Sequence, residues 1–363
     1  MTKWLLLSLT CVAPMALGRQ PQTAVEACQN LTSGSSCNIN HNSGQCFRLS
    51  KSQALICRAD KLVIAKTSLQ DRASGMPPAR RHQVIQSEGL RNKVPADRDP
   101  IASSRIKVTL QGAWRVIEAN GISAHKTGAF PNSGNPHEIA TQRYKYQVPT
   151  SPKMAAKPTS VTLQNFGIAV NGVPFDPSAA EWYLGNRGLW RYEALSGAVP
   201  LGVDENYAHV QPNGAYHYHG LPSGLLARLQ VNADRHSALI GWAADGFPIY
   251  ALYGYNEGGN EESGIVKMHS SYRVKSGQRP KGHAQPGGYY DGTFVADYEF
   301  VEGAGSLDEC NGRFVRTPDF PLGTYAYFLT EEWPIIPRCF RGTPSKDFRR
   351  GPRMGRPKHR VKG

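Results

Sequence analysis

The chain has 363 residues and a formal net charge of +14. Residues 346–363 hold eight basic residues and one acid, so this segment alone carries half of the net charge. It lacks a series of interleaved aromatic side chains for base stacking, so we expect no specific nucleic-acid partner. The composition of residues 346–363 instead predicts a disordered basic tail that adheres weakly to polyanions.

Residues 1–18 have the pattern of a signal peptide. Lys3 provides the positive charge, residues 4–17 the apolar stretch, and Ala16-Leu17-Gly18 a small-residue cleavage site. No later segment is apolar over the length needed to span a bilayer, so we expect no transmembrane segment. The mature protein is therefore predicted to be secreted, either extracellular or periplasmic. The sequence does not indicate an oligomeric state.

Six cysteines remain once Cys11 leaves with the signal peptide. Four of them lie in residues 19–66, a predicted small cysteine-rich module: Cys28, Cys37, Cys46 and Cys57. Their spacings do not match a zinc knuckle, so we expect two disulfides there, with the connectivity left open. Cys310 and Cys339, far away in the sequence, are expected to bond to each other.

Residues 67–100 are polar and basic and are predicted to be a linker, followed by a core domain over residues 101–345. The core contains several dipeptides typical of two-residue hairpin turns. These are Asn120-Gly121, Asn171-Gly172, Asp245-Gly246, Asp291-Gly292 and Asn311-Gly312. Runs rich in β-forming residues flank them, and the best helix candidate is residues 225–231. We therefore expect a mainly β fold, a sandwich or irregular barrel of antiparallel strands with short helices, beside a small disulfide-bonded N-terminal module.

The most informative segment is Tyr216-His217-Tyr218-His219. Side chains alternate along a strand, so His217 and His219 should share one face and the two tyrosines the other. Asn213-Gly214 predicts a turn just before this strand, which would return His209 to the same pair. Three neutral imidazoles with a carboxylate suit a divalent transition metal such as zinc or copper. Histidines on a half-buried strand also serve as hydrogen-bonded core residues, and His125 and His137 are further candidates for the group.

The chain lacks the sequence motifs of several other classes of protein. Cys310 and Cys339 have no adjacent histidines, so the His-Cys-His segment of a multicopper oxidase is missing. No Gly-x-Ser-x-Gly elbow indicates a serine hydrolase, and no glycine-rich phosphate loop indicates nucleotide binding.

These residues carry a resemblance to a known family. The core resembles the YHYH-motif family of secreted proteins, which is named for the run at residues 216–219. Further blocks share this resemblance: residues 120–122, 130–132, 167–175, 208–212, 243–250, 290–294, 307–313 and 323–330. The resemblance implies a fold and an extracellular location more than an activity. It also marks acids that could approach the histidines, namely Asp204, Asp245, Asp291, Asp308 and Glu309.

From the sequence we hypothesise a secreted metal-binding protein. In a catalytic form it would be a metal-dependent enzyme that acts on an extracellular polymer or a small anion. His209, His217 and His219 would be the metal ligands. Asp204 or Asp245 would be a ligand or general base, and Arg313 would bind an anionic group. Asp245 precedes a glycine and is equally well explained as a turn residue.

The alternative is a noncatalytic module that binds carbohydrate or a surface polymer. Trp182, Trp190, Tyr289 and Tyr290 would then form a stacking platform, and the histidines would be structural. Core packing is the commonest role of such aromatic residues, so this alternative is not favoured by default.

Overall fold

The computed structural model describes residues 35–39, 42–47, 56–59, 82–90 and 92–349. The chain divides into two units, residues 1–76 and 77–363. The first contains an antiparallel sheet of β1 (Ser36–Ile39), β2 (Asn42–Phe47) and β3 (Ile56–Ala59). Cys46 on β2 is disulfide-bonded, and the pairing expected among the four N-terminal cysteines falls on side chains outside the described residues.

The strands of the second unit are mostly short. Eight of them form one sheet: β8 (Gly167–Ala169), β9 (Pro174–Phe175), β10 (Ala208–Val210), β11 (Tyr216–Tyr218), β12 (Gly241–Ala243), β13 (Pro248–Ala251), β20 (Gly312–Thr317) and β21 (Phe320–Leu329). Their order is β10-β11-β9-β8-β12-β13-β21-β20. Strands β8, β11 and β13 are buried along their whole length, so both faces of the sheet are covered where they lie.

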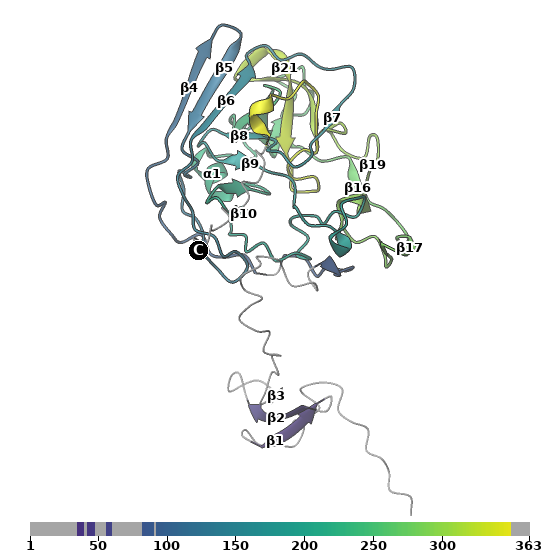
Figure 1. The fold of residues 1–363 in the computed structure, drawn as a ribbon. Helices are drawn as coiled ribbons and strands as arrows, with labels where there is room; N and C mark the ends of the chain where they lie inside the picture. Colours follow the sequence, from purple (N-terminus) through teal and green to yellow (C-terminus); the bar gives the residue numbers. More distant parts are fainter. Residues whose placement is uncertain (1–34, 40–41, 48–55, 60–81, 91, 350–363) are drawn as a thin grey trace, which may run out of the picture. The chain divides into compact units, whose positions relative to one another are not determined.

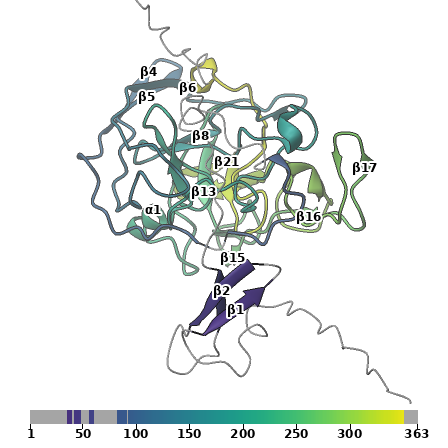
Figure 2. The ribbon, with the colours of Figure 1, turned by 60° about the horizontal axis from the view of Figure 1, so that its bottom comes forward.

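Smaller sheets and short helices surround this sheet. The strands are β4 (Ile106–Gln111), β5 (Trp114–Ala119) and β6 (Tyr144–Pro149) in one sheet, and the pairs β7 (Thr159–Ser160) with β22 (Cys339–Phe340), β14 (Tyr253–Tyr255) with β15 (Ile265–Lys267), β16 (Tyr272–Val274) with β19 (Tyr298–Phe300), and β17 (Lys281–Gly282) with β18 (Gln285–Pro286). The helices are η4 (Tyr183–Gly185), α1 (Ser223–Arg228), η5 (Val295–Asp297) and η6 (Lys346–Phe348). Figures 1 and 2 show β4–β6 on one side of the large sheet and β16 and β17 on the other.

The predicted fold class is confirmed, with two refinements. The described chain is mainly β, and its several sheets do not close into a barrel. The large sheet is not purely antiparallel, because β11 pairs with β9, and β13 with β21, in parallel. Parallel partners require long connections, so they bring together residues that are far apart in the sequence. None of the helices in the described part of the chain has the length and apolar character needed to cross a membrane.

The described residues of the predicted linker, 82–90 and 92–100, lie in the second unit. Among them, the Val94 backbone N–H donates to Val203 and the Val94 carbonyl accepts from Glu205. Arg98 and Thr127 exchange two backbone hydrogen bonds of 3.0 and 2.9 Å. Backbone pairing of this kind is not signalled by a polar composition, which is why the sequence suggested a linker.

The predicted tail begins too early. Residues 346–348 form η6, and Phe348 is 1% exposed and stacks on Tyr146 with ring centroids 4.1 Å apart. The Asp347 carboxylate accepts a 2.9 Å hydrogen bond from the Gln147 backbone N–H on β6. The rest of the expected tail, residues 350–363, lies outside the described residues. The predicted Cys310–Cys339 disulfide is present and closes a loop with a sequence separation of 29.

The burial of Phe348 predicts that shortening this one side chain lowers the stability of the protein strongly. Phe348→Ala should destabilise the protein by about 3–5 kcal/mol, because it removes a stacked ring from the core. Leu322→Ala is the control, since Leu322 is 93% exposed, and should change stability by less than about 0.5 kcal/mol. Urea unfolding of both variants checks this, and equal free energies of unfolding would show that η6 is not part of the core.

Candidate metal centre

The β10–β11 hairpin is built by a turn that requires glycine. Gly214 has φ +82°, and a β-carbon there would lie 2.4 Å from the β-carbon of Ala140. The Asn213 side chain accepts from the Ala215 backbone N–H, and Gln211 and Ala215 pair across the turn. The turn therefore sets a register in which His209 lies directly opposite His217.

This register brings three histidines to one face. His209 and His217 are cross-strand partners, and His219 follows His217 by two residues, so all three side chains point the same way. The ring centroids are 4.6, 4.7 and 4.8 Å apart, nearly an equilateral triangle. One ring nitrogen from each lies within 4.8 Å of the other two, and the group could hold a metal ion. The structure thus brings together the three histidines named from the sequence.

Two of the rings contact backbone carbonyls. The Nδ1 atom of His209 lies 3.0 Å from the Leu201 carbonyl oxygen, and that of His217 lies 3.1 Å from the Ala215 carbonyl oxygen. Because a carbonyl oxygen only accepts, Nδ1 carries the hydrogen in neutral His217. The Nε2 of this ring lies 3.3 Å from the Gln211 side-chain amide. Nδ1 of His209 lies 3.0 Å from the Asn135 side-chain amide as well as from the Leu201 carbonyl. Metal-binding histidines are commonly oriented in this way.

The Nε2 atoms of His217 and His219 are 3.0 Å apart. Zinc–nitrogen bonds of about 2.0–2.1 Å with tetrahedral angles place two ligand nitrogens about 3.3 Å apart. The observed spacing is close to that value. The Nδ1 atom of His219 is buried and has no hydrogen-bond partner among the described residues.

A buried carboxylate beside the histidines was missed by the sequence analysis. Asp176 is 1% exposed, and its Oδ2 lies 3.8 Å from Nε2 of His217. It follows β9, whose parallel pairing with β11 sets Phe175 opposite Tyr218, and its backbone N–H donates to the Tyr218 carbonyl at 2.8 Å. Only this long-range pairing brings Asp176 to the histidines, and its local sequence, Phe175-Asp176-Pro177, gave no signal.

Burial keeps the three rings neutral. It lowers the pKa of His217 to about 4 and the pKa values of His209 and His219 well below the usual range. The neighbouring histidines lower the last two further, because nearby protonated rings would repel each other. Neutral imidazoles are the form that binds metal ions.

The opposite face of β11 is a closed hydrogen-bond network. The Tyr216 hydroxyl donates to Asp204 at 2.6 Å. The Tyr218 hydroxyl lies 2.6 Å from Nε2 of His125 and accepts from the Asn171 side chain at 2.8 Å. His125 thus belongs to the tyrosine face and not to the histidine group.

The three predicted catalytic residues lie elsewhere. Asp204 accepts from the backbone N–H groups of Gly128, Asn206 and Ala208 as well as from Tyr216. Asp245 accepts from the Tyr327 hydroxyl and the Gly342 backbone N–H, and burial raises its pKa to about 6. Arg313 on β20 donates to the Asn256 carbonyl at 3.2 Å. None of the three belongs to the group of possible metal ligands in the described part of the chain.

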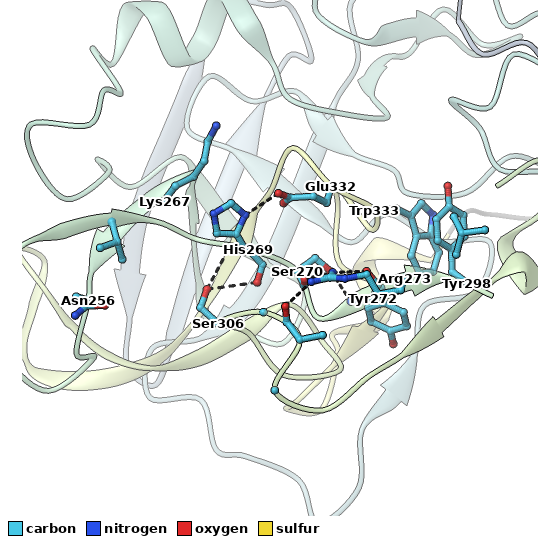
Figure 3. A pocket seen from close by; sticks show the side chains of 15 residues that line it. Asn256, Lys267, His269, Ser270, Tyr272, Arg273, Tyr298, Ser306, Glu332 and Trp333 are labelled. Carbon is cyan, nitrogen blue, oxygen red and sulfur yellow. Dashed lines mark hydrogen bonds and ion pairs between the residues drawn. The ribbon is translucent and has the colours of Figure 1, made fainter. Parts of the chain in front are cut away.

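A separate cavity of about 860 Å³ lies over β15, β16 and β19 (Figure 3). The His269 ring bonds Glu332 at 2.7 Å on one wall. On another wall Trp333 stacks face to face on Tyr298, with centroids 4.1 Å apart, and meets the edge of Tyr272. Trp333 and Tyr298 therefore cover one face of each other in this cavity.

Comparison with known proteins identifies the family of the chain. The run Tyr216-His217-Tyr218-His219, which lies on the buried hairpin, corresponds to the name of one family. The model of the YHYH protein family matches residues 145–342, which include the hairpin, Asp176 and both cysteines of the core disulfide. The chain belongs to this family. Searches of curated proteins and of solved structures found no match.

The neutral histidines predict a pH dependence of stability for the metal-free protein. Below about pH 6.5 the unfolded chain protonates its histidines, whereas buried His217, with its pKa of about 4, stays neutral. Stability contributed by His217 is therefore present at neutral pH and is lost as the pH falls, by about 1.4 kcal/mol per unit between pH 6.5 and 4. Urea unfolding in chelator from about pH 7 to pH 5 should show a shallower pH dependence for His217→Gln than for the unchanged protein. Identical slopes would mean that His217 is not held neutral.

Proposed function

We propose that this protein is a secreted metal-binding protein whose core binds one divalent transition-metal ion, zinc or copper, through His209, His217 and His219. The observation that carries the proposal is the convergence of three neutral ring nitrogens, two of them oriented by backbone carbonyls. Histidine clusters of this composition suit zinc and copper better than magnesium or calcium, which prefer oxygen ligands.

Asp176 provides the negative charge that a buried cation needs. Its carboxylate lies 3.8 Å from one ring nitrogen and is itself buried, so it faces the ion in a medium of low dielectric. The Ser178 backbone N–H donates to Oδ1 of this side chain at 3.1 Å, and Oδ2 is the oxygen that lies 3.8 Å from His217. Asp176 therefore takes the place that the sequence analysis gave to Asp204 or Asp245.

Three histidine ligands leave a further ligand position on a tetrahedral ion. The bound ion would act as a Lewis acid toward an oxygen of the substrate. In that catalytic form the substrate would be a small anion or an extracellular polymer. The contacts of Asp204, Asp245 and Arg313 give no support to catalytic roles, and the proposal does not include them.

Secretion is supported by two features. Residues 1–18 have the order of charge, apolar stretch and small residues that typifies a signal peptide. The Cys310–Cys339 disulfide is stable in an oxidising compartment outside the cytoplasm.

The contacts of the aromatic residues do not favour the carbohydrate-binding alternative. Trp190 is buried, and its indole N–H donates to Gln285 at 2.6 Å. Among the four aromatic residues named for that role, Tyr289 alone is exposed, and Trp182 and Tyr290 are half-buried. In the cavity of Figure 3, Trp333 and Tyr298 stack on each other, so one face of each ring is not open to a sugar.

The metal proposal predicts the behaviour of single-histidine variants. Protein purified without a His-tag should contain about one equivalent of a transition metal by elemental analysis and should melt at a lower temperature in chelator. His217→Ala and His219→Ala should each weaken metal binding by more than about tenfold and remove the chelator effect. Tyr218→Phe should keep the metal, because its ring lies on the opposite face.

His236→Ala is the matched control, since His236 is 5% exposed but stands outside the histidine group. It should keep the metal while losing some stability. A metal-free unchanged protein, or a His236 variant that loses metal as fully as the His217 variant, would contradict the proposal.

A further inference from the structure

A second cavity, of about 800 Å³, lies over the sheet of β4, β5 and β6. Its charged lining consists of four basic residues and one acid: Arg105, Lys107, Arg143, Lys145 and Glu118. We call this cavity the basic groove. Lys145 forms an ion pair with Glu118 at 3.4 Å, whereas the other three basic residues form none with any described residue. The groove therefore carries positive charge that its own lining does not neutralise.

Strand pairing places these charges on one face of the sheet. Lys107, Glu118 and Lys145 are direct neighbours across β4, β5 and β6. Arg105 and Arg143 precede the two lysines by two residues each, so alternation along the strands puts them on the same face. All four basic residues are exposed.

The other face of the sheet packs on the core. Ile106, Ala119 and Tyr144 alternate with the charged residues, and they belong to the main hydrophobic cluster or pack against it. The backbone at the end of the sheet is fixed as well, because the Arg105 backbone N–H donates to the Asn120 side chain at 2.9 Å. The groove is thus a cationic outer face on a sheet that is anchored from behind.

The distribution of the charges fits a ligand with several anionic groups. Neighbouring strands lie about 4.7–4.9 Å apart, so the backbones of Lys107 and Lys145, with β5 between them, are about 10 Å apart. Two residues along a strand span about 6.6–6.8 Å, which separates Arg105 from Lys107. Like charges repel, so the four side chains spread over the groove rather than converge on one small ion. A chain that repeats an anionic group along its length matches this arrangement.

The groove lacks the surface on which proteins stack nucleic-acid bases. Among the described residues that line it, Tyr144 alone is aromatic, and its ring stacks on Tyr146 with centroids 5.4 Å apart. Base binding uses exposed aromatic faces. A sugar hydroxyl needs only a polar partner, and Oε1 of Gln142 in the lining accepts no hydrogen bond from a described residue. Sugar binding here would depend on charge, and not on the stacking platform considered above.

The rim of the groove is joined to the hairpin of the candidate metal centre. The Gln142 side-chain amide donates to the Asn213 carbonyl at 3.2 Å, and the Ala140 backbone N–H donates to the Gly214 carbonyl at 2.9 Å. Asn213 and Gly214 form the turn that sets the register of the histidines. A polymer in the groove would therefore contact the segment that supports this turn.

We propose that the basic groove binds an acidic polysaccharide, a sugar polymer that carries carboxylate or sulfate groups along its chain. The proposal deepens the proposed function by naming the class of extracellular polymer. It rests on that function for the location outside the cell. The groove consists of protein groups alone, so its test does not require a metal ion.

The test is calorimetric titration of the full chain with sodium polygalacturonate and with dextran sulfate, with neutral dextran as the reference polymer. The unchanged protein should bind at least one acidic polymer, more weakly as salt is added, and should not bind neutral dextran. The tighter of the two tells whether the groove prefers carboxylate or sulfate. The double variant Lys107→Gln, Arg143→Gln should bind about tenfold more weakly and with a smaller dependence on salt.

The matched control is the double variant Lys157→Gln, Arg187→Gln. It loses the same charge at exposed residues outside the groove, and should bind within about twofold of the unchanged protein. Equal weakening in both double variants would show attraction by overall charge and would overturn the proposal. Absence of binding to either acidic polymer, equal binding of neutral dextran, or tighter groove-dependent binding of a short DNA duplex would overturn it too.

Elemental analysis of the same samples separates this proposal from the metal proposal. Metal in the unchanged protein, with polymer binding that the groove variant does not change, would overturn the groove and leave the metal proposal intact. Groove-dependent polymer binding in protein without metal would support the groove and contradict the metal proposal.

Discussion

The arrangement of the site depends on the hydroxyl groups of two buried tyrosines. Tyr216 donates to Asp204, and Tyr218 lies between His125 and Asn171, all of them inside the core. A strand has only two faces, so fixing the tyrosines on one side fixes His217 and His219 on the other. A slip of one residue would place the imidazoles against Asp204 and leave the tyrosine hydroxyls without their partners. The tyrosine network therefore holds the register in which the histidines converge.

The neighbours of β11 then give the histidine face its chemistry. The antiparallel partner β10 adds His209, and the parallel partner β9 adds Asp176. Burial keeps the rings neutral and makes any cation there dependent on the nearby carboxylate. Neutral nitrogen donors and one acid together favour a cation at this place.

Local sequence predicted the parts of this site that depend on local geometry. Alternation along the strand placed His217 and His219 together, and the Asn213-Gly214 turn returned His209 to them. Asp176 could not be predicted, because it arrives through the pairing of β9 with β11, two segments far apart in the chain. The same limit explains Asp204 and Asp245, whose partners Tyr216 and Tyr327 are distant side chains that no local pattern reveals. Packing of single residues was likewise hidden, as with Val94 in the expected linker and Phe348 in the expected tail.

The central claim is that one metal ion lies between the three ring nitrogens of the β10–β11 hairpin. Anomalous X-ray diffraction from a crystal of the protein, at wavelengths on both sides of the zinc and copper absorption edges, tests it most directly. The account predicts one anomalous peak about 2.0–2.1 Å from a ring nitrogen of each of His209, His217 and His219, on the face of β11 opposite the tyrosines. A histidine cluster without an anomalous peak, its rings hydrogen-bonded only to one another and to water, would contradict it.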